Sequence, residues 1–472
     1  MRLPGAASLV LVLVLALAAA DCARYHAQPV DPAVFPAAYH QRRLDDPALV
    51  AFVARWSEVP PRNLWSERQL ALAALKLRPE LARARAEWRT ALAGERSAGA
   101  RPQPGAQADV ERAVSGSEGQ SPWVVSLAGL LTLELGGKRG ARLQQARART
   151  AGAESELHLT FWRVVEETRT AALGVMLAGA ELDGAHRELD AVARVLGFER
   201  ERFAEAALTS SELARTGAEL QDARAAVASA ERALLDARAR LAGLVGLPAR
   251  ALDSVQVSVS PAVGCEAVDS LASDSLEALA LSHRAEVGRV LAEYAGAEAV
   301  LHLQVARQYP DLDLSPGFIW DQGVHRWTVA LAAPALFAFR NHAPIAEAMA
   351  ARSAAAARIA QVQDSVLAEV GVAVAGCRGG RLEQVGADSQ VVAARRALAV
   401  AESAYQRGET TRLDAALSEL GVVRAERSSR GADRTVRLAA VALDVAVGVW
   451  RGVAGGRWPD PRKDIDVQGA TK

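Results

Sequence analysis

The sequence is poor in the residues that metal and redox chemistry use. Its 472 residues include three cysteines and eight histidines. The cysteines, Cys22, Cys265 and Cys377, have no Cys-x-x-Cys spacing, and no two histidines stand four positions apart. These absences argue against a zinc site and against a redox pair of cysteines. We therefore expect no metal site and no cofactor.

Catalytic motifs and an excess of charge are also missing. The chain has no Gly-x-Ser-x-Gly sequence and no phosphate-binding loop, and acidic pairs such as Glu166-Glu167 lie on predicted helix surfaces. The 55 basic and 55 acidic residues cancel, so no net charge attracts nucleic acid. The sequence predicts neither an enzyme nor a nucleic-acid-binding protein.

The N-terminus has the pattern of an exported protein. Arg2 precedes an apolar run from Leu9 to Ala20, which is too short to span a bilayer, and residues 1–21 are predicted to be a signal peptide. Cys22 follows directly and resembles the lipidated cysteine of a bacterial lipobox, although Asp21 departs from that motif. We expect a lipid on Cys22 and a lipid-anchored leader over 22–64. The alternative is cleavage after the alanines that end the run, which leaves Cys22 unmodified.

One sequence pattern occurs twice in the chain. Arg78-Pro79-Glu80-Leu81 returns as Arg284-Ala285-Glu286-Val287, and the Trp123 and Trp327 segments match in the same way. Further along, four residues of the first copy, Phe203, Ala206, Thr209 and Glu212, align with Tyr405, Gly408, Thr411 and Asp414. Repeats of this length indicate a duplicated domain. We assign the first repeat to 65–250 and the second to 276–450, with an inter-repeat linker over 251–275 and a tail over 451–472.

Each repeat has the same predicted elements. In the first, a helix over about 67–95 is followed by strands within about 100–137, where apolar residues alternate from Trp123 to Leu135. A very long helix over about 138–205 comes next. After Thr209, which is a helix-capping residue, a second helix has large apolar residues at heptad spacing: Leu213, Leu220, Val227, Leu234 and Leu241.

The second repeat continues in the same order. Its elements are a helix over about 276–308, strands within about 309–338, a helix to Tyr405, a turn at Gly408 and a helix to about Val449. The strand pair is Leu312 to Trp320 and Trp327 to Phe337, with a turn at Asp321-Gln322-Gly323. Pro334 and the Asn341 to Pro344 region are expected to end these strands before the long helix begins.

Two strands per repeat cannot stand alone. A lone hairpin is marginal in water, and an open sheet edge is not viable in a membrane. Four strands per chain therefore require other subunits, and three chains would supply twelve strands. We predict a mainly α-helical fold with a membrane β-barrel portion, in which a trimeric barrel of 12 strands stands on a long coiled-coil barrel of helices.

With its elements in this order, the chain resembles the TolC-type outer-membrane efflux proteins over about Trp65 to Trp450. The Tyr405-x-x-Gly408 sequence followed by Asp414 resembles the motif at that family's periplasmic tip. The resemblance implies a passive homotrimeric duct in the outer membrane, with a periplasmic tunnel that docks onto an adaptor protein and an inner-membrane pump. It places the gate and adaptor contacts at Phe203, Ala206, Thr209, Glu212, Tyr405, Gly408, Thr411 and Asp414.

The tip also departs from the family. Leu417 stands where some members carry a second aspartate, and the usual arginine is absent, although Arg412 is close. Asp414 has a second interpretation, as a carboxylate that stabilises a helix N-terminus. The expected cargo is small molecules or metal ions. The alternatives are the duct of a type I protein secretion system, and a lipid-anchored structural coiled coil without a channel.

Overall fold

The computed structural model divides the chain into two compact units, residues 1–42 and 43–472. It describes residues 25–57, 63–112, 114, 121–253, 255–259, 265–269, 272–333, 341–448 and 458–465. The predicted signal peptide and the predicted lipidation site at Cys22 lie outside the described residues. So do the proposed strand end from Pro334 to Phe337 and parts of the linker and tail.

The described part of the first unit contains one short helix, α2 (Val34–Gln41), and none of its residues is buried. At its end the Arg42 N–H donates to the Tyr39 carbonyl at 3.2 Å, and the Arg42 guanidinium lies 5.6 Å from the Tyr39 ring centroid. These contacts fix the end of the helix.

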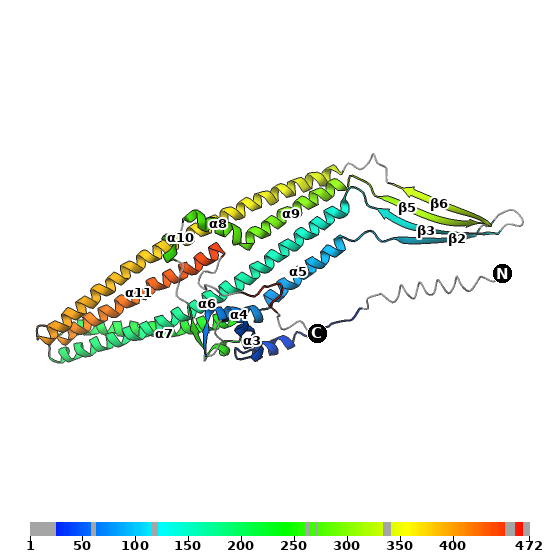
Figure 1. The fold of residues 1–472 in the computed structure, drawn as a ribbon. Coiled ribbons are helices and arrows are strands. Elements are labelled where there is room, and N and C mark those ends of the chain that lie inside the picture. Colours follow the sequence, from blue (N-terminus) through cyan, green and yellow to red (C-terminus); the bar gives the residue numbers. More distant parts are fainter. Residues whose placement is uncertain are drawn as a thin grey trace. The chain divides into compact units, whose positions relative to one another are not determined.

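In the second unit, two series of elements follow one another (Figure 1). The first series is α4 (Glu67–Leu77), α5 (Pro79–Ala98), β2 (Gly105–Arg112), β3 (Trp123–Leu133), α6 (Lys138–Ala204) and α7 (Ser210–Val245). The second series is α8 (Ser273–His283), α9 (Ala285–Ala306), β5 (Leu312–Asp321), β6 (Val324–Ala332), α10 (His342–Gln406) and α11 (Arg412–Val447). Shorter elements flank them: α3 (Pro47–Trp56), β1 (Leu64–Ser66), η1 (Ala249–Leu252), β4 (Gln256–Ser258) and η2 (Glu266–Asp269).

Two segments that were each predicted to be one helix are each divided into two helices. The helix expected over 67–95 breaks at Arg78, and the one expected over 276–308 breaks at Arg284. Both arginines have extended backbone: Arg78 has φ −79° and ψ 128°, and Arg284 has φ −72° and ψ 125°. Pro79 explains the first break, because the residue before a proline is disfavoured in the helical region. Arg284 precedes an alanine, so proline does not explain the second break, and the ion pairs from Arg284 to Glu286 and Glu369 have counterparts at Arg78.

The predicted strands form one four-stranded sheet with the order β2-β3-β5-β6, and all of its pairs are antiparallel. The central pair sets Leu127 opposite Phe318 and Val125 opposite Trp320. The alternating apolar residues of β3 are exposed, and so are Trp327, Val329 and Leu331 of β6. Exposure of large apolar side chains on a sheet indicates a surface that another apolar phase covers.

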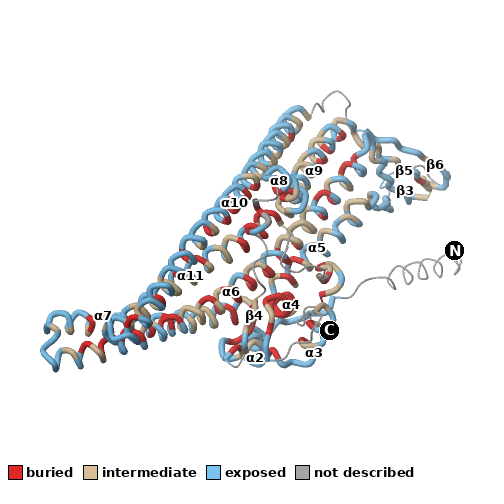
Figure 2. Tube along the Cα trace, turned by 60° about the vertical axis from the view of Figure 1, so that its left-hand side comes forward, coloured by how far each residue is buried: buried red, intermediate tan, exposed pale blue. Residues whose placement is uncertain are grey.

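The long helices pack side by side as the heptads predict. Over the first turns of α7 the buried residues are Thr216, Leu220, Ala223, Val227 and Ala230, so large and small side chains alternate along the seam with α6. Burial follows stripes along these helices and concentrates around α4, whose residues Leu70 to Leu75 are fully buried (Figure 2). No helix among the described residues is both long and apolar enough to cross a membrane.

The sequence analysis proposed no bridge between cysteines, and the structure has one. Cys265, in the inter-repeat linker, and Cys377, in α10, are joined by a disulfide. They are separated by 112 residues, and spacing along a sequence carries no signal for a bond across so long a loop. The two sulfur atoms meet because η2 lies against α10, which only the folded chain shows.

Candidate functional site at the two helical turns

The predicted site residues gather at two turns, one between α6 and α7 and one between α10 and α11. In Figure 1 both turns lie at the end of the second unit that is opposite the four-stranded sheet. At the first turn the Ala207 N–H donates to the Arg202 carbonyl at 2.9 Å, and Ala206 has a φ of 59°. Alanine rarely adopts a positive φ, so the backbone conformation of this turn costs conformational free energy.

The second turn has the same hydrogen bond and the same backbone. The Glu409 N–H donates to the Ala404 carbonyl at 2.9 Å, and Gly408 has a φ of 76°. Glycine adopts this conformation without a steric penalty. The sequence alignment of Ala206 with Gly408 therefore joins two positions that share one left-handed backbone conformation.

Each turn ends in a reciprocal helix cap. The Glu212 N–H donates to the Thr209 hydroxyl at 3.3 Å, and the Thr209 N–H donates to the Glu212 carboxylate at 2.9 Å. Thr411 and Asp414 repeat the arrangement with the same two distances. A cap of this kind satisfies amide groups that the first helical turn leaves without partners.

The capping hydrogen bonds set the electrostatics of both carboxylates. The hydrogen bond from the Thr411 hydroxyl, followed by that from its backbone N–H, lowers the pKa of Asp414, and Arg202 adds a smaller lowering. The same two bonds from Thr209 lower the pKa of Glu212. Both groups are therefore ionised at neutral pH, and the nearest partner of each is its own capping threonine.

The start of α11 is attached to the end of α6. The Arg412 guanidinium lies 5.2 Å from the Phe198 ring centroid, and Leu413 is buried with Val195 and Leu196 of α6. Leu417 is 45% exposed and does not join this cluster. Phe203 and Tyr405, the aromatic residues of the two turns, are 43% and 44% exposed, so each turn presents an open ring to solvent.

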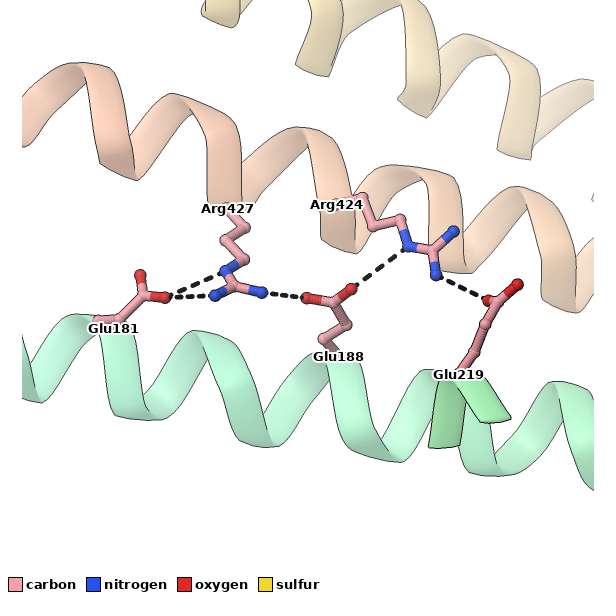
Figure 3. Close-up of polar contacts among 5 residues, drawn as sticks. All are labelled: Glu181, Glu188, Glu219, Arg424 and Arg427. Atoms are coloured by element: carbon pink, nitrogen blue, oxygen red, sulfur yellow. Dashed lines mark hydrogen bonds and ion pairs between the residues drawn. The ribbon is translucent and has the colours of Figure 1, made fainter. Parts of the chain in front are cut away.

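A ladder of ion pairs, which the sequence analysis missed, joins α11 to α6 and α7 (Figure 3). Arg427 of α11 contacts Glu181 at 2.7 Å and Glu188 at 2.8 Å, both on α6. Arg424 of α11 contacts the same Glu188 at 3.3 Å and Glu219 of α7 at 2.9 Å. We call these five residues the Glu–Arg ladder. Glu188 is its centre, because both arginines share its carboxylate.

The ladder joins a helix of the second series to two helices of the first. The sequence shows Glu181 and Glu188 seven positions apart and Arg424 and Arg427 three apart, which places each pair on one helix face. Helical spacing does not say which face meets which helix. The partners follow only from the packing of α11 against α6.

The described residues contain no group of three or more His, Cys, Asp or Glu side chains that could hold a metal ion. At the turns the structure has helix caps and exposed aromatic rings, and ion pairs join the helices that lead to them.

One known protein family matches part of the chain. Residues 70–247 match the family model described as outer membrane efflux protein, which confirms the resemblance seen in the sequence. That family consists of passive channels, in agreement with the prediction that the chain is not an enzyme. No curated protein sequence matches the chain.

Solved structures share the fold. The outer membrane protein VceC of Vibrio cholerae matches with a TM-score of 0.65 and 20% identity, over 81% of this chain and 96% of VceC. The CmeC outer membrane channel of Campylobacter jejuni matches with a TM-score of 0.64 and 15% identity, over 85% of this chain and 90% of CmeC. The MtrE outer membrane channel of Neisseria gonorrhoeae, in its open state, matches with a TM-score of 0.57 and 20% identity, over 81% and 89%.

Proposed function

We propose that three copies of this chain form a passive exit duct in the outer membrane, which passes small molecules or metal ions from an inner-membrane pump and a periplasmic adaptor to the outside. The observation that carries the proposal is the incomplete sheet. Among the described strands, the outer ones, β2 and β6, each pair with one neighbour, so each has an edge that no described strand covers. A free edge in a bilayer leaves backbone groups without hydrogen bonds, and closure into a barrel removes both edges.

The layer of helices also has two outer members, at the same two sides as the outer strands of the sheet. Contacts run from α5 to α6, from α6 to α9 and from α9 to α10, which leaves α5 and α10 at the outer positions. In both layers the first series supplies one edge and the second series the other. A second copy would therefore set its β2 and α5 against β6 and α10 of the first, and a head-to-tail contact of this kind closes a ring.

The outer face of α10 supports this contact. The exposed large apolar side chains in the middle and second half of α10 include Val372, Leu382, Val385, Val392 and Val400. The buried seam of α10, with Val366, Val370, Ala373 and Cys377, packs instead in the cluster that contains α11 residues. A helix with a second apolar stripe needs a second helical neighbour, and a further copy of the chain provides one.

The proposal includes a duplicated unit. Arg78 makes ion pairs with Glu80 at 2.9 Å and Glu167 at 2.5 Å, and Arg284 makes the matching pairs with Glu286 and Glu369. The equivalent caps at the two turns support the same relationship. In the assembled duct the two turns would form the periplasmic tip. There Phe203, Tyr405 and the nearby polar residues would meet the adaptor, and Asp414 would contribute to closure.

The N-terminus completes the proposal, with Cys22 as the lipid anchor in the outer membrane. A type I protein secretion duct would use the same fold with another pump. A lipid-anchored structural coiled coil would leave the free strand edges unexplained.

The mass of the protein in detergent tests the assembly. The chain has a mass of 49.8 kDa, so we expect a protein mass of three such chains by light scattering, from which the detergent contribution is subtracted. A matched variant, Val385→Glu, places a charge on the apolar stripe and should shift the protein toward single chains. A single chain for the unmodified protein would contradict the proposal.

A further inference from the structure

A small cleft lies where the two series of elements meet. Its volume is about 160 Å³, and its walls come from α6 of the first series and from the α8–α9 junction and the end of α11 of the second. A cavity of about 150 Å³ is large enough to hold a benzene molecule. None of the described residues that line the cleft belongs to α5 or α10, so the proposed contacts between copies through those helices do not cover it.

Helix α6 supplies an aromatic wall of the cleft. Trp162 and Glu166 line the cleft four residues apart, which places them on one face of the helix. The Trp162 ring contacts the Phe161 ring at a centroid distance of 5.1 Å and the Trp458 ring at 5.9 Å, and Trp162 remains 36% exposed. Val441 of α11 lines the cleft as a second apolar side chain. The cleft therefore places an apolar surface of the size of a ring beside a carboxylate.

Two arginines that line the cleft, Arg169 and Arg284, each make ion pairs with two carboxylates of the chain. The partners are Asp444 at 2.5 Å and Glu67 at 3.4 Å for Arg169, and Glu286 at 3.0 Å and Glu369 for Arg284. An anionic ligand would have to compete with these carboxylates for the guanidinium groups. The cleft is therefore a poor site for an anion.

The carboxylate of Glu166 lies in surroundings that are short of positive charge. It forms no hydrogen bond or ion pair with another residue that the structure describes. Burial, followed by the neighbouring Glu167 carboxylate, raises the pKa of Glu166, and Glu286 acts in the same direction. Arg284 and Arg163 act in the opposite direction and do not cancel the increase in this pKa. A cation bound beside Glu166 would stabilise its ionised form.

We propose that this cleft binds a compact organic amine. The protonated amine donates hydrogen bonds to the Glu166 carboxylate, and its apolar ring or chain packs against Trp162 and Val441. Calcium and magnesium ions fit less well, because they require several oxygen ligands and Glu166 is a single carboxylate beside an indole ring. The site lies within one chain, so it does not depend on the proposed duct or on its trimer.

Ligand-observed NMR with benzylamine tests the site on the full-length protein in detergent, with protein-free micelles as the background. For a ligand of about eight non-hydrogen atoms we expect a dissociation constant of about 1 mM. Benzyl alcohol, a neutral analogue of the same size, should bind at least about tenfold more weakly, because it makes no charge-assisted hydrogen bond to Glu166. Glu166→Gln should weaken benzylamine binding by a similar factor. Unchanged binding of benzyl alcohol by this variant would show that the cleft is intact.

Glu167→Gln is the matched control. The Glu167 carboxylate pairs with Arg78 at 2.5 Å and does not line the cleft, so its loss should change the affinity for benzylamine by less than about threefold. Trp162→Ala should weaken the binding of both probes, since both pack on the indole ring. Equal losses in the two glutamate variants, equal binding of the two probes, or no saturable binding of benzylamine by the unmodified protein would overturn the proposal.

Discussion

The turn between α6 and α7 and the turn between α10 and α11 share one backbone and differ in their residues. Both place a left-handed residue three positions before a capping threonine, with the same two capping distances. The first turn uses Ala206 where the second uses Gly408. The comparison shows that the helix cap and the residue with positive φ define the turn. Glycine at the positive-φ position only lowers the conformational free energy that the turn requires.

The two turns also differ in how their second helices are held. Helix α7 packs on α6, its own partner within the series. Helix α11 packs on α10 and is also joined to α6 and α7 by the Glu–Arg ladder and by Arg412 over Phe198. In the proposed duct, movement of the second turn must therefore break contacts of α11 with both helices of the first series, whereas α7 meets the second series through α11.

The largest effect is expected from Glu188→Lys, which sets a cation against Arg424 and Arg427 at once. We expect the packing of α11 on α6 to lose about 2 kcal/mol of free energy. The reason is that two charge-assisted hydrogen bonds to Glu188 are replaced by repulsion between like charges. Conductance of the duct in a planar bilayer should rise several-fold. Glu219→Lys, which meets Arg424 alone, is the matched control and should have about half the effect. Equal effects of the two variants would mean that Glu188 is not the centre of the ladder.

Two substitutions of Asp414 distinguish its role as a helix cap from a role in closure of the duct. Asp414→Asn keeps an acceptor for the Thr411 N–H and removes the charge, whereas Asp414→Ala removes both. If Asp414 contributes to closure by its charge, both variants should raise single-channel conductance. A rise with alanine alone would assign Asp414 to the cap, and unchanged conductance in both would remove it from the gate.

The left-handed positions should respond in opposite directions. Gly408→Ala should destabilise the second turn by about 1 kcal/mol, since a positive φ is costly for a residue with a Cβ atom. No neighbouring atom lies within 4 Å of that Cβ position, so the cost is one of backbone conformation alone. Ala206→Gly should stabilise the first turn by a similar or smaller amount. Hydrogen exchange at the turn amides measures both, and changes of the same sign would refute the shared geometry.

The smallest effect is the response of the caps to acid. The folded-state pKa values of Asp414 and Glu212 lie below their ordinary values of 3.8 and 4.5. Each carboxylate therefore contributes stability that is present above its ordinary pKa and is lost as the pH falls through the lower folded value. Amide exchange at the first turns of α7 and α11, corrected for intrinsic rates, should accelerate together below about pH 4. Acceleration of one helix start alone would show that the two caps differ.

The sequence predicted the parts that local patterns determine. The apolar alternation from Trp123, the heptads after Leu213 and the capping residue Thr209 all have the structures expected of them, and Thr411, which aligns with Thr209, caps its helix in the same way. These signals lie within a single element, where periodicity and side-chain chemistry suffice.

The parts that sequence reasoning missed depend on contacts between distant elements. Arg284, at the second helix break, pairs with Glu369 of α10, and the ladder depends on which face of α11 meets α6. The disulfide depends on η2 lying against α10. None of these partners can be read from the spacing of residues along one helix.

The central claim is that copies of this chain close into a channel, and conductance of the purified protein in a planar bilayer tests it most directly. We predict small, discrete channel steps from a preparation whose mass in detergent is that of three chains. Glu188→Lys should enlarge the steps without changing the mass. A preparation of three chains that never conducts, in either form, would contradict the account.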